Sequence, residues 1–212
     1  MPAAVARGLR ETQKLRTRQA LLDATLELLE GEHSFASVSL REVTRSAGIV
    51  PTAFYRHFRD MDELGLALVE ESFRTLRQLM RDARSAPLPA RQLIRRSVET
   101  FVAHVRTHRR HFRFIARERA GGRSAIRAAV RSEIRLVVSE LATDLGRFPI
   151  TSTWRTEDLQ MTASLLVAAM MNGMLDILDL PPSRPDEEAE LTRMLEKQLR
   201  LVVLGAGQWK SA

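Results

Sequence analysis

The sequence contains no cysteine, so it can form neither a disulfide nor a thiolate-ligated metal site, which is consistent with a reducing cytoplasm. The content of turn-forming and aromatic residues is low for a β-sandwich or barrel and favours helices: the 212 residues include ten glycines, eight prolines and one tyrosine. The longest apolar run, 165–180, is interrupted by polar residues and falls short of the roughly 20 residues that cross a bilayer, so we interpret it as a buried helix. The polar, basic start of the chain predicts no signal peptide, no membrane insertion and a cytoplasmic protein.

Sequence motifs of enzyme active sites are also missing. The chain has no glycine-rich phosphate loop, no Gly-x-Ser-x-Gly elbow and no cysteine nucleophile, so we expect no catalytic residue and no cofactor. His104, His108 and His111 are spaced four and three residues apart and could share one helical face, as metal ligands do. Arginines crowd this segment and no carboxylate lies close by in the sequence. A solvated turn is therefore the favoured interpretation, and no metal is expected.

Charge is distributed unevenly along the chain. The net charge is +7, and residues 1–60 hold nine basic and seven acidic side chains. Residues 91–135 hold thirteen arginines, no lysine and only three acidic residues. Arginine binds phosphates and carboxylates in a bidentate manner. This arginine-rich segment is therefore either a docking surface for a phosphate-bearing or acidic ligand, or a solvated basic face that adds nonspecific attraction to DNA.

Apolar residues recur three and four positions apart along the chain, and no segment alternates as a strand would. We therefore predict an all-α protein of about nine helices, with a three-helix module over 1–60 and a six-helix body over 61–212. Helices are expected at 12–30, 39–47, 52–57, 156–180 and 184–209, among others. The first of these should bury Leu15, Leu22, Leu26 and Leu29, and helix breaks are expected at Gly31, Gly48, Gly121, Gly122, Pro87, Pro89, Pro149, Pro181 and Pro182.

The N-terminal module carries the start and stop signals of two short helices. Ser39 precedes Glu42 by three residues, which is the spacing of a reciprocal capping box. Gly48 can end the first of these helices in a left-handed conformation, and Pro51 suits the first position of the next one, where no N–H is needed. Two short helices joined by a tight turn with a glycine form a helix-turn-helix, although such pairs also occur in all-α proteins that do not bind DNA.

Side-chain chemistry favours the DNA-binding interpretation. The second helix would enter the major groove and present hydroxyl, imidazole and guanidinium groups that bind phosphates or base edges, while the small Ala53 allows close approach. The basic segment before Lys14 could follow the DNA backbone or lie in the minor groove as an N-terminal arm. The expected DNA contacts are Lys14, Arg16, Ser39, Arg41, Arg45, Pro51, Thr52, Ala53, Tyr55, Arg56, His57 and Arg59.

Four short motifs in this region resemble the TetR family of transcriptional regulators: Ser39-Leu40-Arg41-Glu42-Val43, Ala47-Gly48-Ile49, Phe54-Tyr55-Arg56-His57-Phe58 and Asp62-Glu63-Leu64. The resemblance implies a nine-helix TetR-like fold, a homodimer and an inverted-repeat operator in double-stranded DNA. Val50, Thr52 and Met61 depart from the family's usual residues. Met61 stands where a lysine is common, so the phosphate contact of that lysine would have to come from Arg56 or Arg59.

A narrower resemblance is to fatty-acid regulators of the FabR and DesT type. It rests on 34–37, 51–60, 62–66, 76–81 and the Phe112-Arg113 and Arg117-Glu118-Arg119 motifs. It implies control of unsaturated fatty acid synthesis or acyl desaturase genes by a long-chain acyl-CoA or acyl-carrier-protein thioester. The expected ligand contacts are Leu76, Met80, Phe101, Phe112, Arg113, Ile115, Arg117, Arg119, Met170, Met171 and Met174, with Arg123 as a further phosphate ligand.

Two interpretations of the body remain open. Its methionines and aromatic residues could line an acyl tunnel, because methionine adapts to irregular space, or they could form ordinary core. The family resemblance assigns the last two helices to the dimer interface, where the small residues 167–169 and Gly173 would permit close approach. The same residues could instead pack within one chain. A repressor of an efflux operon that binds a drug-like ligand is the alternative function.

Overall fold

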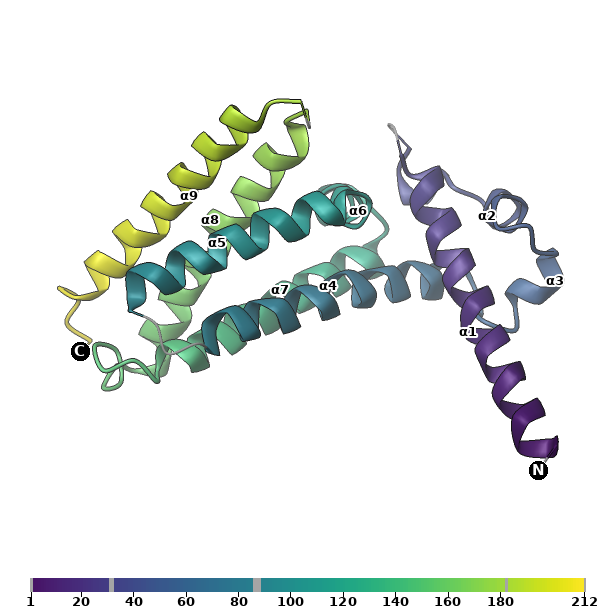
Figure 1. Ribbon diagram of the computed structural model, residues 1–212, viewed down its shortest axis with the longest axis horizontal. Helices are drawn as coiled ribbons and strands as arrows, with labels where there is room; N and C mark the ends of the chain where they lie inside the picture. The colour runs from purple at the N-terminus through teal and green to yellow at the C-terminus, as the bar shows by residue number, and fades with distance from the viewer. Residues whose placement is uncertain (1, 31–32, 86–88, 182, 212) are drawn as a thin grey trace. The chain divides into compact units, whose positions relative to one another are not determined.

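The computed structural model describes residues 2–30, 33–85, 89–181 and 183–211; over these residues the chain forms nine α-helices, one short 3-10 helix and no strand (Figure 1). This confirms the predicted all-α class. The breaks expected at Gly31, Pro87 and Pro182 lie outside the described residues. In chain order the elements are α1 (Pro2–Leu28), η1 (Phe35–Ser37), α2 (Leu40–Ser46), α3 (Pro51–Phe54), α4 (Met61–Ser85), α5 (Ala90–Thr107), α6 (Arg109–Ala120), α7 (Ser124–Leu145), α8 (Thr156–Asp179) and α9 (Pro185–Ala206).

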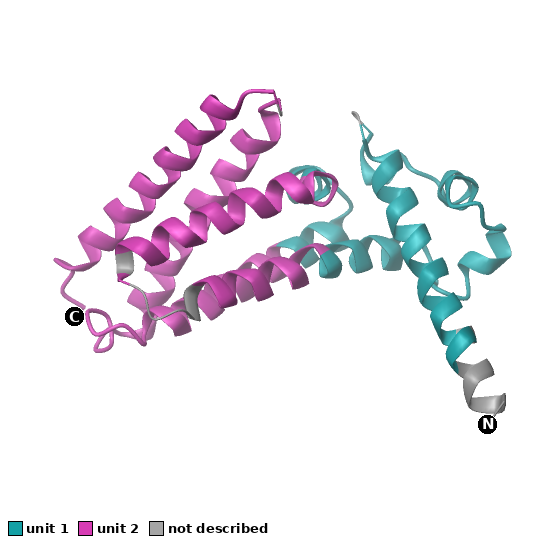
Figure 2. Cartoon of the chain, in the orientation of Figure 1, with its two compact units in different colours: residues 1–71, 113–130 teal, residues 72–112, 131–212 magenta. Residues whose placement is uncertain are grey.

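The chain divides into two compact units (Figure 2). Unit 1 comprises residues 1–71 and 113–130, and unit 2 comprises residues 72–112 and 131–212. The three N-terminal helices therefore pack with the start of α4 and with the corner between α6 and α7. The domain boundary after residue 60 remains a prediction.

The helix-turn-helix in unit 1 forms through local signals. The Ser39 backbone N–H donates to the Glu42 carboxylate (2.8 Å), and the Glu42 N–H donates to the Ser39 hydroxyl (3.3 Å), which completes the capping box. Gly48 has a φ of 66°, the left-handed conformation that a glycine adopts without strain. Pro51 is the first residue of α3. These three predictions are confirmed.

Helix α1 corrects two predictions. It begins at Pro2 instead of Thr12, so the basic segment expected as an extended arm is helical; the side chains of Arg7 and Arg10 lie outside those described. Alanine and arginine are strong helix formers, and this segment is rich in both. Leu15 is 64% exposed, although its spacing predicted burial with Leu22. Full burial along α1 begins only at Leu21, and residues 11–16, the segment that holds Leu15, are exposed.

The second helix of the pair is shorter than expected. Helix α3 ends at Phe54, and residues 55–57 continue as turns in place of the helix predicted over 52–57. The backbone N–H groups of His57 and Phe58 both donate to the Phe54 carbonyl (2.9 and 3.0 Å), so the turns retain a helix-like path. Phe54 and Phe58 are buried as predicted, and their rings lie 5.7 Å apart.

The α6–α7 corner holds the entry to the helix-turn-helix through a buried carboxylate. Glu118 is 1% exposed, and one of its oxygens accepts the Phe35 N–H (3.1 Å). The other oxygen has no hydrogen-bond partner among the described atoms. The side chain occupies the space beside Gly122, where an added Cβ would lie 1.6 Å from that oxygen. Glu118 therefore requires a glycine at position 122.

Two arginines and an aromatic pair complete this contact within unit 1. Arg117 donates to the carbonyls of Leu29 (3.0 Å) and His33 (3.2 Å), which follow the end of α1. Arg123 pairs with Asp62 (2.5 Å) at the start of α4. The Phe35 ring packs edge-on against Phe114, with centroids 5.9 Å apart. Polar and apolar contacts thus fix the residues that lead into α2.

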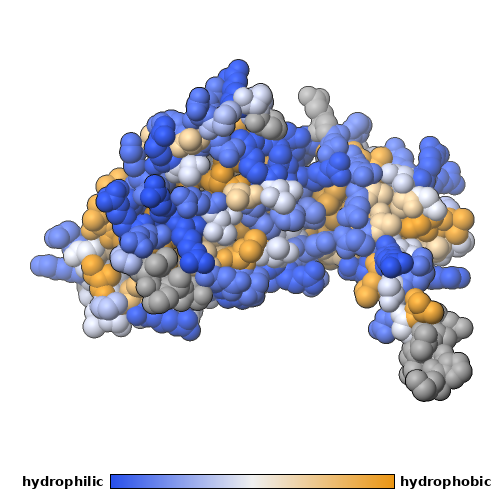
Figure 3. Space-filling model, viewed as in Figure 1, coloured by the Kyte–Doolittle hydropathy of each residue, from blue (hydrophilic) through white to orange (hydrophobic). Residues whose placement is uncertain are grey.

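In unit 2, α8 and α9 pack closely, and α5 packs against both. An added Cβ at Gly173 would lie 2.4 Å from a methyl group of Leu195, so this glycine serves the crossing of α8 and α9 within one chain. Helix α8 is long and apolar enough to span a membrane, but half of its most apolar window is buried in the chain, as in the core helix of a soluble protein. Hydrophobic atoms appear as separate patches on the face seen in Figure 3.

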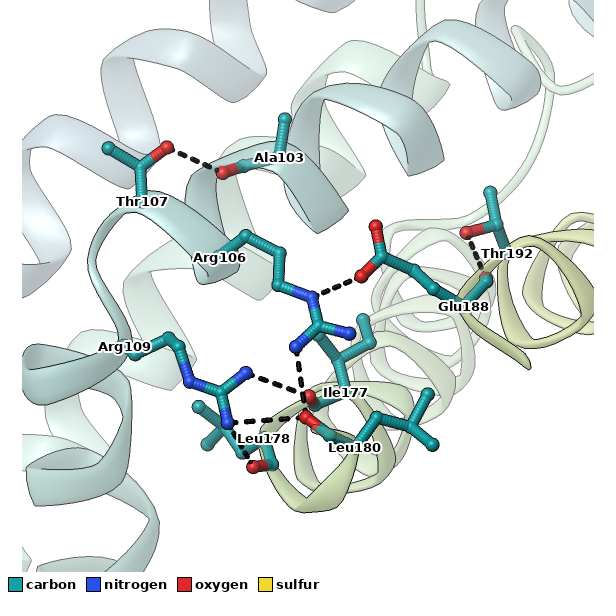
Figure 4. A network of polar contacts seen from close by, with 9 residues as sticks. All are labelled: Ala103, Arg106, Thr107, Arg109, Ile177, Leu178, Leu180, Glu188 and Thr192. Atoms are coloured by element: carbon teal, nitrogen blue, oxygen red, sulfur yellow. Dashed lines mark hydrogen bonds and ion pairs between the residues drawn. The ribbon is translucent and has the colours of Figure 1, made fainter. Parts of the chain in front are cut away.

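Both ends of α8 depart from simple capping. Arg155 occupies the N-cap position expected for Thr156, and it makes no side-chain cap. At the other end, Arg109 donates to the carbonyls of Leu178 (2.6 Å) and Ile177 (3.3 Å), and Arg106 donates to that of Leu180 (3.1 Å) (Figure 4). The last carbonyls of a helix have no N–H partner within it and carry its negative pole, which a guanidinium can satisfy.

Arg106 also binds Glu188 near the start of α9, so one guanidinium joins α5, α8 and α9 (Figure 4). Several members of the arginine-rich segment therefore have structural partners, an explanation that composition alone did not suggest. Those with partners described above are Arg106, Arg109, Arg117 and Arg123. Helix α9 ends at Ala206, three residues before the predicted end at Trp209.

Candidate functional site

The α3 region presents an exposed polar surface. Tyr55 is 62% exposed although it is aromatic, and Thr52 and Arg56 are also exposed. Ala53 and His57 are half-buried. The buried Phe54 and Phe58 anchor the opposite face, so Thr52, Tyr55 and Arg56 point into solvent.

His57 lies where α1 and the α3 turns meet. Its Nδ1 atom is buried without a hydrogen-bond partner among the described atoms. Burial lowers the pKa of His57, and the charges of Lys14, Arg18 and Arg56 lower it further. Three cations around a partly buried imidazole form a site suited to a phosphate. Arg18, whose guanidinium lies 5.0 Å from the centre of the Phe58 ring, was absent from the predicted contacts, although it lies one helical turn after Lys14.

We expect operator affinity to rise as pH falls from about 8 to about 6, because DNA binding should protonate His57. The pKa of His57 is lowered in the free protein. A neighbouring DNA phosphate would raise the pKa of His57 in the complex. The gain in operator affinity is therefore lost as pH rises through the pKa that His57 has in the complex. Fluorescence anisotropy at constant ionic strength measures the effect. The His57→Gln variant should lack this pH dependence. If its operator affinity varies with pH as that of the unmodified chain does, another titratable group is responsible.

The remaining predicted DNA contacts lie on exposed parts of the same unit. Arg41 and Arg45 are exposed on α2, and Arg16 is exposed on α1. The Ser39 hydroxyl is engaged in the capping box, so its first role is structural. Arg59 pairs with Asp60 (3.0 Å), which partly neutralises it. The structure thus brings Lys14, Arg56 and His57 together, while their contact with DNA remains a prediction.

Unit 2 contains a partly open apolar cavity of about 200 Å³. Its walls come from α4, α5, α7, α8 and α9 and from the loop between α7 and α8. Five predicted ligand residues line it, namely Leu76, Met80, Phe101, Met170 and Met171. The other lining residues are Phe73, Arg77, Leu93, Ile94, Ser97, Ile134, Val137, Glu140, Leu141, Leu145, Phe148, Ile150, Thr151, Thr162, Leu166, Val167, Leu199, Val203 and Ala206.

The other predicted ligand residues lie outside this lining. Phe112 and Met174 are buried core of unit 2, and Ile115 is buried in unit 1. Arg113 and Arg119 are exposed, and Arg117 holds the end of α1. Sequence spacing did not identify the contribution of α7, because its lining residues are ordinary apolar positions of an amphipathic helix.

Ion pairs border one side of the cavity. Arg77 pairs with Glu133 (2.8 Å), and Glu140 pairs with Arg81 (3.2 Å). Arg77 and Glu140 are the two charged residues in the lining, and both are neutralised by these partners on α4 and α7. The cavity therefore favours an apolar ligand, with hydroxyls of Ser97, Thr151 and Thr162 as further polar groups.

The three histidines around the α5–α6 junction lie close together. The ring centroids of His104 and His108 lie 4.4 Å apart, and those of His108 and His111 lie 5.8 Å apart. Burial, followed by the charges of His108 and His111, lowers the pKa of His104 to about 4, so this imidazole is neutral at pH 7. Among the residues that the structure describes, no group of three or more His, Asp or Glu side chains is arranged to hold a metal ion.

Comparisons with known proteins agree with both parts of the site. Residues 21–68 match the family described as bacterial regulatory proteins, tetR family. Residues 90–204, more than half of the chain, match the family described as tetracyclin repressor-like, C-terminal domain. The first match contains α2 and α3, and the second contains most of the cavity walls.

Solved structures share the fold at low sequence identity. The fatty acid degradation regulator FadR from Bacillus halodurans is 12% identical with a TM-score of 0.70, over 92% of this chain and 97% of that one. A putative transcriptional regulator from Pseudomonas aeruginosa PAO1 is 20% identical (TM-score 0.71; 90% and 92% covered). The SmeT–triclosan complex is 19% identical (TM-score 0.70; 90% and 91% covered). With its helix-turn-helix and its helical C-terminal domain, the chain belongs to the TetR family of transcriptional regulators, which are DNA-binding regulators and not enzymes.

Proposed function

We propose that this regulator is a repressor of genes for unsaturated fatty acid synthesis or acyl desaturation, and that a long-chain acyl-CoA or acyl-carrier-protein thioester is its effector. The apolar cavity of unit 2 carries the proposal. Its five predicted lining residues include three methionines, whose flexible side chains adapt to chains of different shape. The structural neighbour FadR is described as a regulator of fatty acid degradation, which supports a ligand of this class.

The size of the cavity requires that it adapt to such a ligand. About 200 Å³ is below the roughly 300–1,000 Å³ of pockets that hold drug-sized molecules. A long acyl chain would have to displace Met80, Met170 or Met171. A bent, unsaturated chain and a straight, saturated chain would displace different side chains, and this difference in shape is the basis for distinguishing them. The thioester headgroup would lie outside the apolar walls.

The alternative is a repressor of an efflux operon that responds to a small apolar compound. The neighbour SmeT was solved with triclosan, and the modest cavity volume favours a compact ligand over a long chain. The two functions differ in whether acyl thioesters alter DNA binding.

DNA binding by a dimer completes the proposal. We propose that α8 and α9 form the homodimer interface, because both expose large apolar residues; two examples are Leu201 (73% exposed) and Leu204 (68% exposed). A two-fold dimer presents two α3 helices to an inverted-repeat operator in double-stranded DNA. An effector can change operator affinity only if it binds the two conformations of the dimer unequally. The protein would act in the cytoplasm, bound to the nucleoid when on DNA.

The test is operator binding with and without effectors. Duplexes bound by the protein are selected from a random library, and operator affinity is then measured by fluorescence anisotropy. Palmitoyl-CoA, palmitoleoyl-CoA and triclosan are added separately, with free CoA as the control. We expect the two acyl thioesters to change operator affinity differently, one of them by roughly 5- to 150-fold.

Each result decides between the functions. A response to triclosan alone would favour the efflux repressor. Equal operator affinity with the two thioesters and with free CoA would contradict the acyl-sensor proposal while leaving the assignment to the TetR family intact. A Val137→Phe variant, which fills part of the cavity, should lose the response to the thioesters but keep operator affinity.

A further inference from the structure

We propose that one end of the cavity is a gate for the ligand, formed by the α7–α8 loop (residues 146–155) and closed by a C-terminal strap (residues 207–211). This inference rests on the proposed role of the cavity as the effector site, but it holds for any ligand that enters there. The loop, the strap and the cavity all belong to unit 2.

The α7–α8 loop is a part of the cavity wall that reaches solvent. Phe148, Ile150 and Thr151 line the cavity together with Val203 and Ala206 near the end of α9. Ile150 is 57% exposed, so the same side chain borders both the cavity and the solvent. Thr151 is buried and its hydroxyl donates to the Leu145 carbonyl, which ties the loop to the end of α7.

The C-terminal strap covers this loop and is pinned by one side chain. Ser211 accepts the backbone N–H of Arg155 (2.9 Å) and donates to the Asp158 carboxylate in the first turn of α8. Arg155 is the N-cap residue of α8 and makes no side-chain cap, and its backbone N–H is bound by the Ser211 hydroxyl from 56 residues away. At the other end of the strap, Gly207 lies against Ile150, with 3.4 Å between an added Cβ and the Ile150 side chain. The end of the chain reaches this loop in Figure 1.

The other walls resist opening. They are helices whose backbone hydrogen bonds are internal, and α8 and α9 are locked by the close approach of Gly173 to Leu195. Arg106 and Arg109 tie the opposite end of α8 to α5 and α6. The contacts described for the strap, in contrast, are two hydrogen bonds of Ser211 and the contact of Gly207 with Ile150. A gate is expected where opening breaks the fewest interactions.

A gate has a kinetic signature that differs from that of a binding contact. If the ligand enters and leaves only through the open conformation, a higher open population raises the association and dissociation rates by the same factor. The dissociation constant then stays the same, because the closed cavity and its ligand contacts are unchanged. A residue that touches the ligand changes the dissociation constant instead.

The experiment uses stopped-flow fluorescence with the apolar dye 1-anilinonaphthalene-8-sulfonate as the probe. For Ser211→Ala we expect both rate constants to rise on the order of tenfold, with the dissociation constant nearly unchanged. Ser211→Thr keeps the hydroxyl and should retain the slow rates of the unmodified chain. Ser139→Ala, an exposed serine on α7, is the matched control and should also leave the rates unchanged. The two tryptophans of the chain, Trp154 in the loop and Trp209 in the strap, report the opening of the gate directly.

The other outcomes contradict the gate in distinct ways. Unchanged rates in Ser211→Ala would overturn it, and so would a changed dissociation constant, which would mean that Ser211 contacts the ligand. If sedimentation shows that Ser211→Ala changes the oligomeric state, the strap forms a contact between subunits and not a gate. If the dye binds equally well to the cavity-filling Val137→Phe variant, both the gate and the cavity as effector site fail. If dye binding is gated but acyl thioesters do not change operator affinity, the acyl-sensor proposal is contradicted and the gate is not.

Discussion

Replacing Tyr55 with phenylalanine and His57 with alanine in the same chain is expected to lower operator affinity by about 100-fold or more, because each removes a hydrogen bond to a charged phosphate. Tyr55 is 62% exposed on a surface whose core is formed by Phe54 and Phe58. Tyr55→Phe keeps the ring of residue 55 and the imidazole of His57 is only half-buried, so the fold should persist. Fluorescence anisotropy with the selected operator measures the loss.

Controls separate DNA contact from folding and from general charge. Arg184→Ala removes an exposed arginine that pairs with Glu187 in unit 2, and it should leave operator affinity nearly unchanged. The thermal midpoint of the double variant should stay within a few degrees of that of the unmodified chain. Unchanged operator affinity in the double variant would show that α3 and its following turns do not lie against the DNA.

Replacing Gly122 with alanine is expected to destabilise the protein by about 2–3 kcal/mol and to lower Tm by about 4–12 °C. The new Cβ would lie 1.6 Å from a carboxylate oxygen of Glu118 and 3.0 Å from its Cα. The Glu118 side chain must therefore move, and its bond to the buried Phe35 N–H breaks. Because Phe35 leads into α2, operator affinity should fall as well.

The neighbouring glycine provides a matched control. An added Cβ at Gly121 meets its nearest atom at 3.9 Å, an ordinary contact, so Gly121→Ala should cost little or even stabilise. In a double-mutant cycle, Gly122→Ala combined with Glu118→Ala should destabilise by at least about 1 kcal/mol less than the sum of the single changes. Additive effects would mean that the two residues do not share the space that the structure gives them.

Predictions that rested on neighbouring residues were the most successful. The capping box of Ser39 and Glu42, the left-handed Gly48 and the initial Pro51 each depend on backbone groups no more than a few positions away, and all three are confirmed. The prediction of Thr156 as a helix cap used the same logic and is wrong. Its place is taken by Arg155, whose own backbone N–H is bound by the hydroxyl of the distant Ser211.

The candidate site was predictable only in part. Five lining residues of the cavity were named from the sequence, because methionines and aromatic residues stand out in composition. Arg117 was predicted to bind ligand, yet the structure shows it bound to the carbonyls of Leu29 and His33, more than 80 residues away. Leu15 has the helical spacing of a core residue but is exposed, because burial also requires another element that packs against that position.

The sequence by itself determined the helices, the helix-turn-helix and the residues that α3 exposes, because these follow from interactions within one or two turns of the chain. Tertiary structure alone decided which arginines serve the fold, why residue 122 must be glycine, and which side chains enclose the cavity. These features depend on contacts between segments far apart in sequence. Periodicity shows that a helix face is buried, but it does not show which face of which other helix covers it.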